Sequence, residues 1–195
     1  MPRMAGRDWI KNGPRVFGYE PGWLWWAVLF AAVCAGLFWA SSELDRQQKT
    51  RAYLYERASF HANEQGLDSV LVHAVIQAES SWDWQAESPA GARGRMQVMP
   101  IALEEVKRLE GIEDGDLYDV DYNLRVGTLY LAYLLDRFEG DVALAVAAYH
   151  MGPTAIAKGQ RKYPGLPSRD MIDKHAGPQT KAYVKKVFGL LEEDR

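Results

Sequence analysis

The chain of 195 residues has little cysteine, little histidine and no large excess of charge of one sign. Its single cysteine, Cys34, excludes an internal disulfide framework, and His61 and His73 have no partner at a metal-ligand spacing. A net charge of −3 with 48% hydrophobic residues describes an ordinary globular protein and gives no reason to expect nucleic acid as a partner. Internal repeats, low-complexity tracts and strand-like alternation are also missing. We therefore expect a helical domain without a metal site or a cofactor.

The longest apolar segment covers residues 21–42, which contain no charged residue. About 20 apolar residues are enough for a helix to cross a bilayer, and tryptophans near both ends, Trp23 and Trp39 among them, fit the aromatic belts of the two interfaces. A cleaved signal peptide and a buried core helix are the alternatives. Bulky Phe38 and Trp39 stand where small residues would precede a cleavage site, so we predict an uncleaved transmembrane anchor.

The residues that flank this segment predict its orientation and a division of the chain. Residues 1–20 carry four Lys or Arg side chains against two acidic ones, which favours an N-terminus in the cytoplasm. No helix breaker occurs from 43 to 65, so a helix should continue from the membrane until Gly66. We expect a short cytoplasmic tail at 1–20, the anchor at 21–42, a helical stalk at 43–57 and a domain outside the cytoplasm at 58–195.

The domain contains an apolar helix that ends in a glutamate. Asp68 is placed to cap its N-terminus, and the face that ends in Glu79 otherwise carries only apolar residues. They are Val72, Val75 and Ile76. Apolar surroundings disfavour a charged carboxylate and raise its pKa, which would let Glu79 act as a general acid near neutral pH. The alternative is a glutamate at a frayed helix end that turns into water.

Apolar periodicity and turn residues predict four further helices downstream. They cover residues 101–110, 123–138 and 142–150, and the last begins at Pro178. Gly127 should permit close helix packing. Between the last two helices we expect a basic loop that contains proline. Its charges are Lys158, Arg161, Lys162 and Arg169. The acidic segment 113–121 lacks the glycine and the final glutamate of an EF-hand, so a solvated loop is expected there.

Five segments recur together in one known family. They are Glu79-Ser80, SPAGARGRMQVMP from Ser88, NLRVGT from Asn123 with Tyr130-Leu131, AAYHMGP from Ala147, and Thr180 with Tyr183-Val184. In this order and spacing the chain resembles the lysozyme-like catalytic domain of soluble lytic transglycosylases, the SLT family. The resemblance implies an all-α, lysozyme-like fold of the goose-lysozyme/SLT type, preceded here by a single transmembrane helix. Together with the anchor predicted from residues 21–42, it leads us to expect a bacterial inner-membrane protein whose catalytic domain lies in the periplasm or otherwise outside the cytoplasm.

The resemblance implies a reaction with one carboxyl group, whereas most glycosidases use two. Glu79 would protonate the oxygen between N-acetylmuramic acid and N-acetylglucosamine in peptidoglycan glycan strands. As a carboxylate it would then take the proton of the muramic C6 hydroxyl, which closes on C1 and gives a 1,6-anhydro sugar. Acid and base would be the same residue.

The resemblance also implies substrate-binding residues around Glu79. They are Ser88, Gln97, Met99, Tyr149, His150 and Tyr183. Without it, Tyr149 would be interpreted as a core tyrosine with a buried partner. The chain departs from the family pattern at three positions. His150 replaces the usual asparagine, Gln179 replaces a glutamate before Thr180, and Arg95 replaces a small apolar residue.

Two other functions remain open from the sequence. A goose-lysozyme-like hydrolase on the same scaffold would need a base for water, for which Asp83, Glu87 and His150 are the candidates. A non-catalytic peptidoglycan-binding component of an envelope machine, with an unidentified protein partner, would need no acid. Retention of Glu79 and its loop favours an enzyme.

Overall fold

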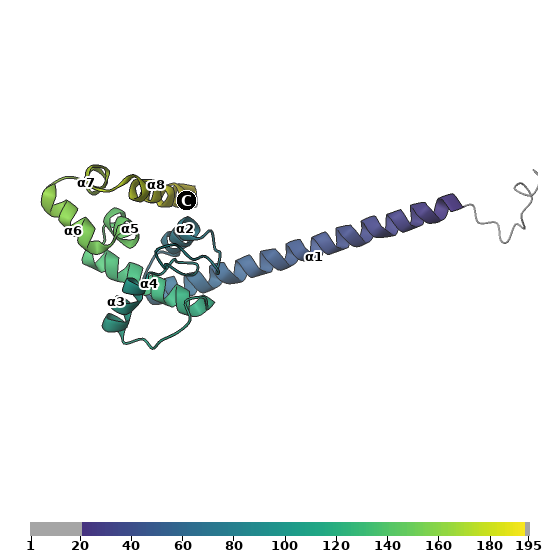
Figure 1. Ribbon diagram of the computed structural model, residues 1–195, viewed down its shortest axis with the longest axis horizontal. Helices are drawn as coiled ribbons and strands as arrows, with labels where there is room; N and C mark the ends of the chain where they lie inside the picture. The colour runs from purple at the N-terminus through teal and green to yellow at the C-terminus, as the bar shows by residue number, and fades with distance from the viewer. Residues whose placement is uncertain (1–20, 194–195) are drawn as a thin grey trace, which may run out of the picture. The chain divides into compact units, whose positions relative to one another are not determined.

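A computed structural model describes the backbone of residues 21–193 and the side chains of residues 26–42 and 50–193. The helices of this part are shown in Figure 1. They are α1 (Pro21–Glu64), α2 (Ser69–Glu79), α3 (Pro100–Glu110), α4 (Val120–Arg137), α5 (Val142–Met151), α6 (Pro153–Lys162), α7 (Ser168–His175) and α8 (Pro178–Glu193). The predicted tail at 1–20 lies outside the described residues. The prediction of an all-α domain is confirmed.

The chain divides into two units, Met1–Thr50 and Arg51–Arg195. The described part of the first unit is the beginning of α1, whose large apolar side chains are exposed. Trp26, Phe30, Phe38 and Trp39 are each at least 70% exposed. Among the residues that the structure describes, no helix is both long enough and apolar enough to cross a membrane. The transmembrane anchor therefore stays a prediction.

Helix α5 is the central element of the second unit. It packs against α4, α6, α7 and α8, while α2 packs against α8 and α3 against α4. Its residues from Ala145 to Ala148 are fully buried, because short side chains let neighbouring helices approach from several sides. The helix predicted at residues 142–150 is confirmed and ends one residue later.

Local signals fix where the helices begin and end. The Asp68 carboxylate accepts a hydrogen bond from the Val70 amide, as the sequence predicted for the start of α2. Gly66 and Gly111 follow α1 and α3 with φ of 66° and 62°, a left-handed conformation that glycine adopts without strain. Gly127 allows the close packing that was predicted, because a Cβ there would lie 2.3 Å from the Met96 sulfur.

The prediction of a basic loop between the last two helices is wrong. Lys158, Arg161 and Lys162 lie on α6, and Arg169 lies on α7. Pro153 starts α6, because proline at the first helical position has no amide to leave unpaired. Gly159 does not break that helix. It lets α7 approach, and a Cβ at this glycine would lie 2.6 Å from the Met171 sulfur.

Candidate active site

Helix α2 ends at Glu79 in a tightly tied turn. The Ser80 amide donates to the carbonyl of Ile76 at 3.1 Å, and its hydroxyl donates to the carbonyl of Arg95 at 2.7 Å. The next two residues, Ser81 and Trp82, have φ of 54° and 72°. A left-handed conformation costs a residue with a side chain about 1–2 kcal/mol, so other contacts must hold this turn in place.

The glycine loop after residue 88 is held by its own polar groups. The Ser88 hydroxyl accepts from the Ala92 amide at 3.0 Å, and the side-chain amide of Gln97 donates to the carbonyls of Ala86 and Gly94, both at 2.9 Å. Both residues were predicted to bind substrate. In the structure their side chains brace the loop, and Gln97 also lines a groove.

A buried amide connects this loop to α4. Asn123 is buried, with a relative exposure of only 1%. Its side-chain nitrogen donates to the carbonyls of Arg93 at 3.0 Å and Leu117 at 2.8 Å, and its side-chain oxygen accepts from the Met96 amide at 2.9 Å. A buried polar group with all three partners satisfied fixes the path of the loop toward Glu79.

The carboxyl group of Glu79 is half-buried, and its surroundings favour the protonated form. Burial raises the pKa of Glu79 to about 7, against the opposing effects of the Tyr183 hydroxyl and the Lys186 ammonium group. The Tyr183 hydroxyl is buried close to this carboxyl, although no hydrogen bond of normal geometry joins them. The Lys186 ammonium donates to the carbonyl of Ala78 at 2.7 Å. The predicted apolar face is confirmed, and Glu79 has the pKa of a group that can give and take a proton at neutral pH.

Two tyrosine hydroxyls, from α5 and α8, stand near this carboxyl. Burial, and then the charge of Glu79, raise the pKa of Tyr149 and of Tyr183 well above the usual value, so both stay protonated. The Tyr149 hydroxyl donates to the carbonyl of Met96 at 2.8 Å. Among the described residues that act on the pKa of Glu79, Lys186 is therefore the charged one.

His150 follows Tyr149 at the end of α5. Its Nδ1 atom lies 3.1 Å from the hydroxyl of Thr180, and its ring lies 4.7 Å from the ring of Tyr183. Burial lowers the pKa of His150, so the imidazole is uncharged at neutral pH. The departure from asparagine thus places a neutral ring beside the buried hydroxyl of Thr180.

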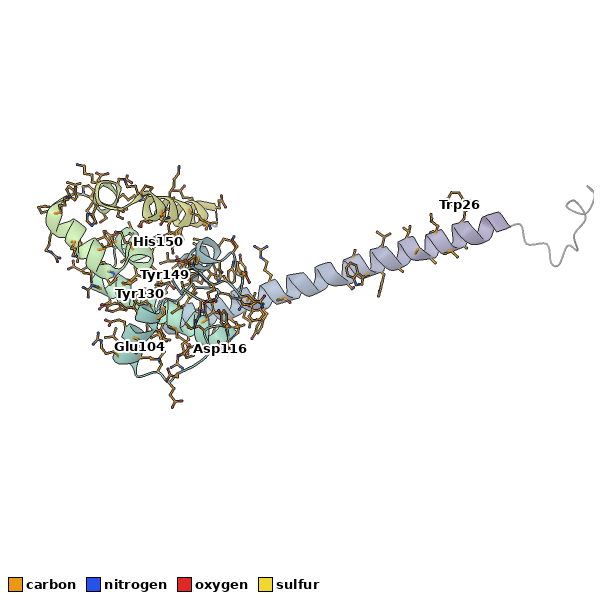
Figure 2. All side chains as sticks on the ribbon, viewed as in Figure 1. Trp26, Glu104, Asp116, Tyr130, Tyr149 and His150 are labelled. Atoms are coloured by element: carbon orange, nitrogen blue, oxygen red, sulfur yellow. The ribbon has the colours of Figure 1, made fainter. Side chains whose placement is uncertain are left out.

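A groove of about 750 Å³ begins beside these residues. Four of the predicted site residues line it, namely Gln97, Met99, Tyr149 and His150, whereas Glu79, Ser88 and Tyr183 do not. Several further residues line the groove that were not predicted as site residues from the sequence. Among them are Tyr130, Tyr133, Arg137, Lys158 and His175. Figure 2 labels Tyr130 close to Tyr149, and the centroids of their rings are 5.5 Å apart. Tyr130 belongs to one of the segments shared with the SLT family, so the sequence contained a signal that could have identified it. The other four residues come together only through the packing of α4, α6 and α7.

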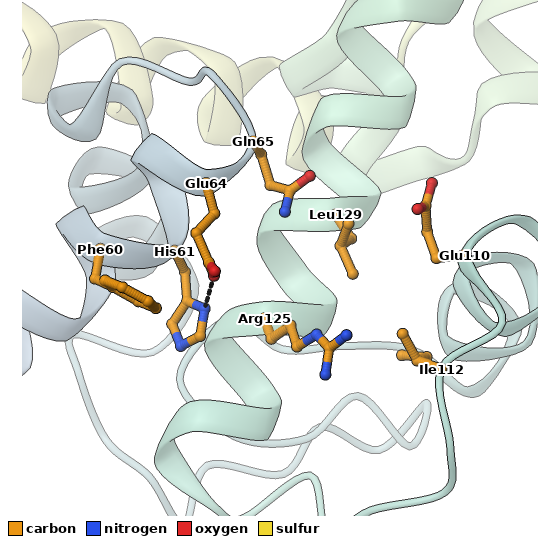
Figure 3. A pocket seen from close by; sticks show the side chains of 8 residues that line it. All are labelled: Phe60, His61, Glu64, Gln65, Glu110, Ile112, Arg125 and Leu129. Atoms are coloured by element: carbon orange, nitrogen blue, oxygen red, sulfur yellow. Dashed lines mark ion pairs between the residues drawn. The ribbon is translucent and has the colours of Figure 1, made fainter.

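A second pocket, of about 470 Å³, lies elsewhere in the same unit (Figure 3). It is lined by Phe60, His61, Glu64, Gln65, Glu110, Ile112, Arg125 and Leu129. The Nδ1 atom of His61 is 3.2 Å from the Glu64 carboxylate, and its Nε2 atom is 3.3 Å from that of Asp121. None of the predicted site residues borders this pocket, so the candidate active site is the region of Glu79.

The family described as "Transglycosylase SLT domain" matches residues 57–172. The chain is 27% identical over 169 residues to the soluble lytic murein transglycosylase of Salmonella typhimurium, which covers 84% of this chain and 26% of that protein. It is 29% identical over 150 residues to the membrane-bound lytic murein transglycosylase C of Histophilus somni, covering 65% of this chain and 41% of that protein.

A solved structure agrees with the sequence matches. An inactive mutant of the lytic transglycosylase Slt from Pseudomonas aeruginosa has a TM-score of 0.65 to this chain at 29% identity, and the match covers 70% of this chain and 23% of that one. The chain thus spans about a quarter of the length of its Salmonella relative. The family match lies within the second unit, and the structural likeness supports the predicted SLT, lysozyme-like fold. With a family match over more than half of its length, the chain belongs to the transglycosylase SLT domain family.

Proposed function

We propose that this protein is a lytic transglycosylase that cleaves peptidoglycan between N-acetylmuramic acid and N-acetylglucosamine. The observation that carries the proposal is the half-buried Glu79 carboxyl at the end of α2, near the protonated hydroxyls of Tyr149 and Tyr183; burial raises the pKa of Glu79 to about 7. A group with this pKa is present in both protonation states at neutral pH, as a residue that serves first as acid and then as base requires.

The proposed reaction uses Glu79 in two steps. The protonated carboxyl gives its proton to the glycosidic oxygen, and the bond from that oxygen to C1 of the muramic sugar breaks. The carboxylate then takes the proton of the C6 hydroxyl while the C6 oxygen bonds to C1, so Glu79 ends protonated and a 1,6-anhydro end is formed. Neutral tyrosines beside Glu79 suit both steps, because neither places a fixed anion next to the carboxylate.

Asp83 and Glu87, the candidates for a second catalytic carboxylate, are exposed and already accept other hydrogen bonds. Asp83 is exposed and accepts a hydrogen bond from the Gln85 amide at 2.9 Å. Exposed Glu87 pairs with Arg93 at 3.2 Å and accepts from the Tyr118 hydroxyl at 3.0 Å; these two contacts lower the pKa of Glu87. This favours the reaction with one carboxyl group over a hydrolase that activates water.

We expect the substrate to be contacted by polar atoms of the loop that have hydrogen-bonding capacity left after their bonds within the protein. The Ser88 hydroxyl accepts within the loop but can still donate its proton to a sugar oxygen. Both N–H groups of Gln97 are used on main-chain carbonyls, so only its side-chain oxygen is left to accept from a sugar hydroxyl. Met99 and His150 would form part of the groove wall, and Tyr183 would close the cleft beside Glu79.

We also propose that residues 21–42 anchor the protein in the inner membrane, with the second unit in the periplasm. The segment has no charge, its described apolar side chains are exposed, and one relative is named a membrane-bound enzyme. Extraction of bacterial membranes with carbonate at high pH tests this. Retention in the pellet, with protease digestion of the second unit in spheroplasts, is expected; release into the supernatant would refute the anchor.

The activity is tested by mass spectrometry of the soluble products from purified peptidoglycan. The full chain in detergent is compared with Glu79→Gln, which keeps the size of the side chain and loses its acid. Anhydro-muropeptides from the unaltered chain alone support the proposal. Products with reducing ends would indicate the hydrolase, and identical traces from both proteins would leave only a binding role, as in a component of an envelope machine.

A further inference from the structure

The last turns of α1 contact the turn that follows the catalytic glutamate. The ring of Tyr55, on α1, stacks on the indole of Trp82, with 4.4 Å between centroids and 18° between planes. Both residues belong to the second unit. Tyr55 lies just before residue 57, where the family match begins. A residue outside the matched segment thus touches the chain three residues after Glu79.

Trp82 packs against the hydrophobic core and against two aromatic rings. Its Nε1 atom is buried without a hydrogen-bond partner among the described residues, so no polar contact orients the ring. The ring of His73 is the other aromatic neighbour, at 5.7 Å, and it lies 4.6 Å from the ring of Tyr55 in an edge arrangement. Of the two ring contacts, the nearly parallel stack on Tyr55 is the one that constrains the plane of the indole.

The turn between Glu79 and Trp82 links the position of the Trp82 ring to that of the Glu79 carboxyl. Ser81 and Trp82 are both left-handed, a conformation that relaxes unless both ends of the turn are held. The end at Ser80 is held by its hydrogen bond to the carbonyl of Arg95, and the end at Trp82 is held by Tyr55. A main-chain hydrogen bond from the Asp83 amide to the carbonyl of Ser80, at 3.2 Å, also spans the turn. We expect loss of either side-chain contact to loosen the end of α2 and to admit water to Glu79.

We propose that Tyr55 is a positioning residue for Glu79: its ring holds Trp82, and Trp82 holds the left-handed turn that keeps the carboxyl in its half-buried site. The last turns of α1 then form part of the catalytic apparatus instead of a passive stalk. The inference rests on the proposed role of Glu79 as acid and base, but its structural part can be measured without activity.

The test substitutes Tyr55→Leu in the full chain, which keeps an apolar side chain and removes the ring. Tyr53→Leu is the matched control, since Tyr53 is two residues away on α1 and 50% exposed. Tyr55→Phe is the rescue variant, because it keeps the ring. For Tyr55→Leu we expect kcat on peptidoglycan to fall about 10- to 100-fold with KM within about twofold, since a misplaced acid impairs the chemical step more than binding. The control and rescue variants should stay within about twofold of the unaltered chain.

A second readout follows the carboxyl directly. NMR of protein with ¹³C-labelled glutamate carboxyl groups, with the Glu79 signal assigned by its loss in Glu79→Gln, gives the pKa of Glu79. The groups that face this carboxyl are Tyr183 and Lys186 of α8 and Tyr149 of α5, and none of them is altered. In Tyr55→Leu, water gains access and the pKa of Glu79 should fall from about 7 toward its ordinary value. A merely structural role for Tyr55 would lower the melting temperature and leave this pKa unchanged.

The outcomes separate this inference from the proposed function. An active unaltered chain with equal kcat and equal Glu79 pKa in Tyr55→Leu and Tyr53→Leu overturns the positioning role alone. If the unaltered chain is inactive but the pKa of Glu79 still falls in Tyr55→Leu, the proposed function is overturned. The positioning of Glu79 by Tyr55 is then supported on its own. Should circular dichroism show Tyr55→Leu unfolded, Trp82→Phe takes its place. Its smaller ring should shift the pKa in the same direction, and an unchanged pKa there counts against the proposal.

Discussion

The Tyr149 hydroxyl donates its only proton to the carbonyl of Met96, 2.8 Å away and 53 residues earlier in the chain. This bond ties the end of α5 to the glycine loop. Because the proton is committed, the phenol oxygen presents lone pairs, and not a donor, to the region of Glu79. Tyr149 therefore shapes the wall around the acid and can accept a hydrogen bond while Glu79 is protonated.

Replacing Tyr149 with phenylalanine should destabilise the domain. Met96 is fully buried, so its carbonyl would lose its partner without access to water, at a cost of about 1–3 kcal/mol. Thermal unfolding should show a melting temperature lower by roughly 2–4 °C for each kcal/mol. Tyr133→Phe is the control, because the Tyr133 hydroxyl pairs with Arg137 at an exposed position and should contribute less than about 0.5 kcal/mol. Equal losses in both variants would contradict a special role for the Met96 contact.

Activity should decrease as pH rises through about 7. The proposed first step needs protonated Glu79, and burial has raised the pKa of this group to about 7. The rate per enzyme with saturating peptidoglycan should therefore fall about tenfold per pH unit well above that value. A rate that stays level to pH 9 would show that Glu79 is not the acid. Circular dichroism at each pH separates loss of fold from loss of the proton.

Glu79→Gln should stabilise the fold above pH 7. The folded chain holds the Glu79 proton up to a pKa of about 7, against a usual value of 4.5, so it binds more protons than the unfolded chain between these values. Stability from this group is full below pH 4.5 and is lost as pH rises toward 7. A neutral glutamine avoids that loss, which is on the order of 2 kcal/mol after allowance for remaining solvent contact. Urea unfolding at pH 8 should show the gain, and the same experiment at pH 4.5 should show little difference.

The sequence was sufficient to predict the parts of the site that depend on periodicity. A spacing of 3.6 residues per turn places Glu79 on the face of Val72, Val75 and Ile76, and all three are fully buried. Burial of that face is also what raises the pKa of Glu79. The helix predicted at residues 142–150 followed in the same way from its apolar pattern and is found as α5.

Contacts between distant segments could not be predicted. Ser88 and Gln97 stand in recognised segments, but only the folded loop shows that their polar atoms bond to Ala92, Ala86 and Gly94. The contact of Tyr55 with Trp82 carries no periodic signal, because it joins a helix to an irregular turn. Helices α6 and α7 were missed because proline and glycine in a basic segment favour a loop in the absence of tertiary contacts.

Gly94→Ala should destabilise the loop far more than Gly91→Ala. Both glycines have positive φ, 72° and 84°, so alanine is strained at either position by about 1 kcal/mol. At Gly94 a Cβ would also lie 2.3 Å from the Asn123 side-chain nitrogen and 2.4 Å from the carbonyl of Leu117, whereas nothing lies within 4 Å at Gly91. We expect a total loss of about 3 kcal/mol or more at Gly94, because the Asn123 bonds must break. Comparable melting temperatures would show that the amide moves aside without cost.

His150→Asn restores the residue that is usual in the family and tests the hydrolase alternative. The imidazole is neutral at pH 7 and its Nδ1 atom lies 3.1 Å from the Thr180 hydroxyl, so it serves as a hydrogen-bond partner and not as a charge. An asparagine side chain can also pair with that hydroxyl, and we expect activity within about threefold and unchanged anhydro products. If His150 instead activated water, the variant would lose products with reducing ends by about 100-fold or more, since a general base contributes 10²–10⁴-fold. Thr180→Val, which removes the partner and keeps the ring, distinguishes the two roles: it should disturb a positioned base as strongly as His150→Asn does, but should have only a small effect if the ring merely fills the wall beside Tyr183.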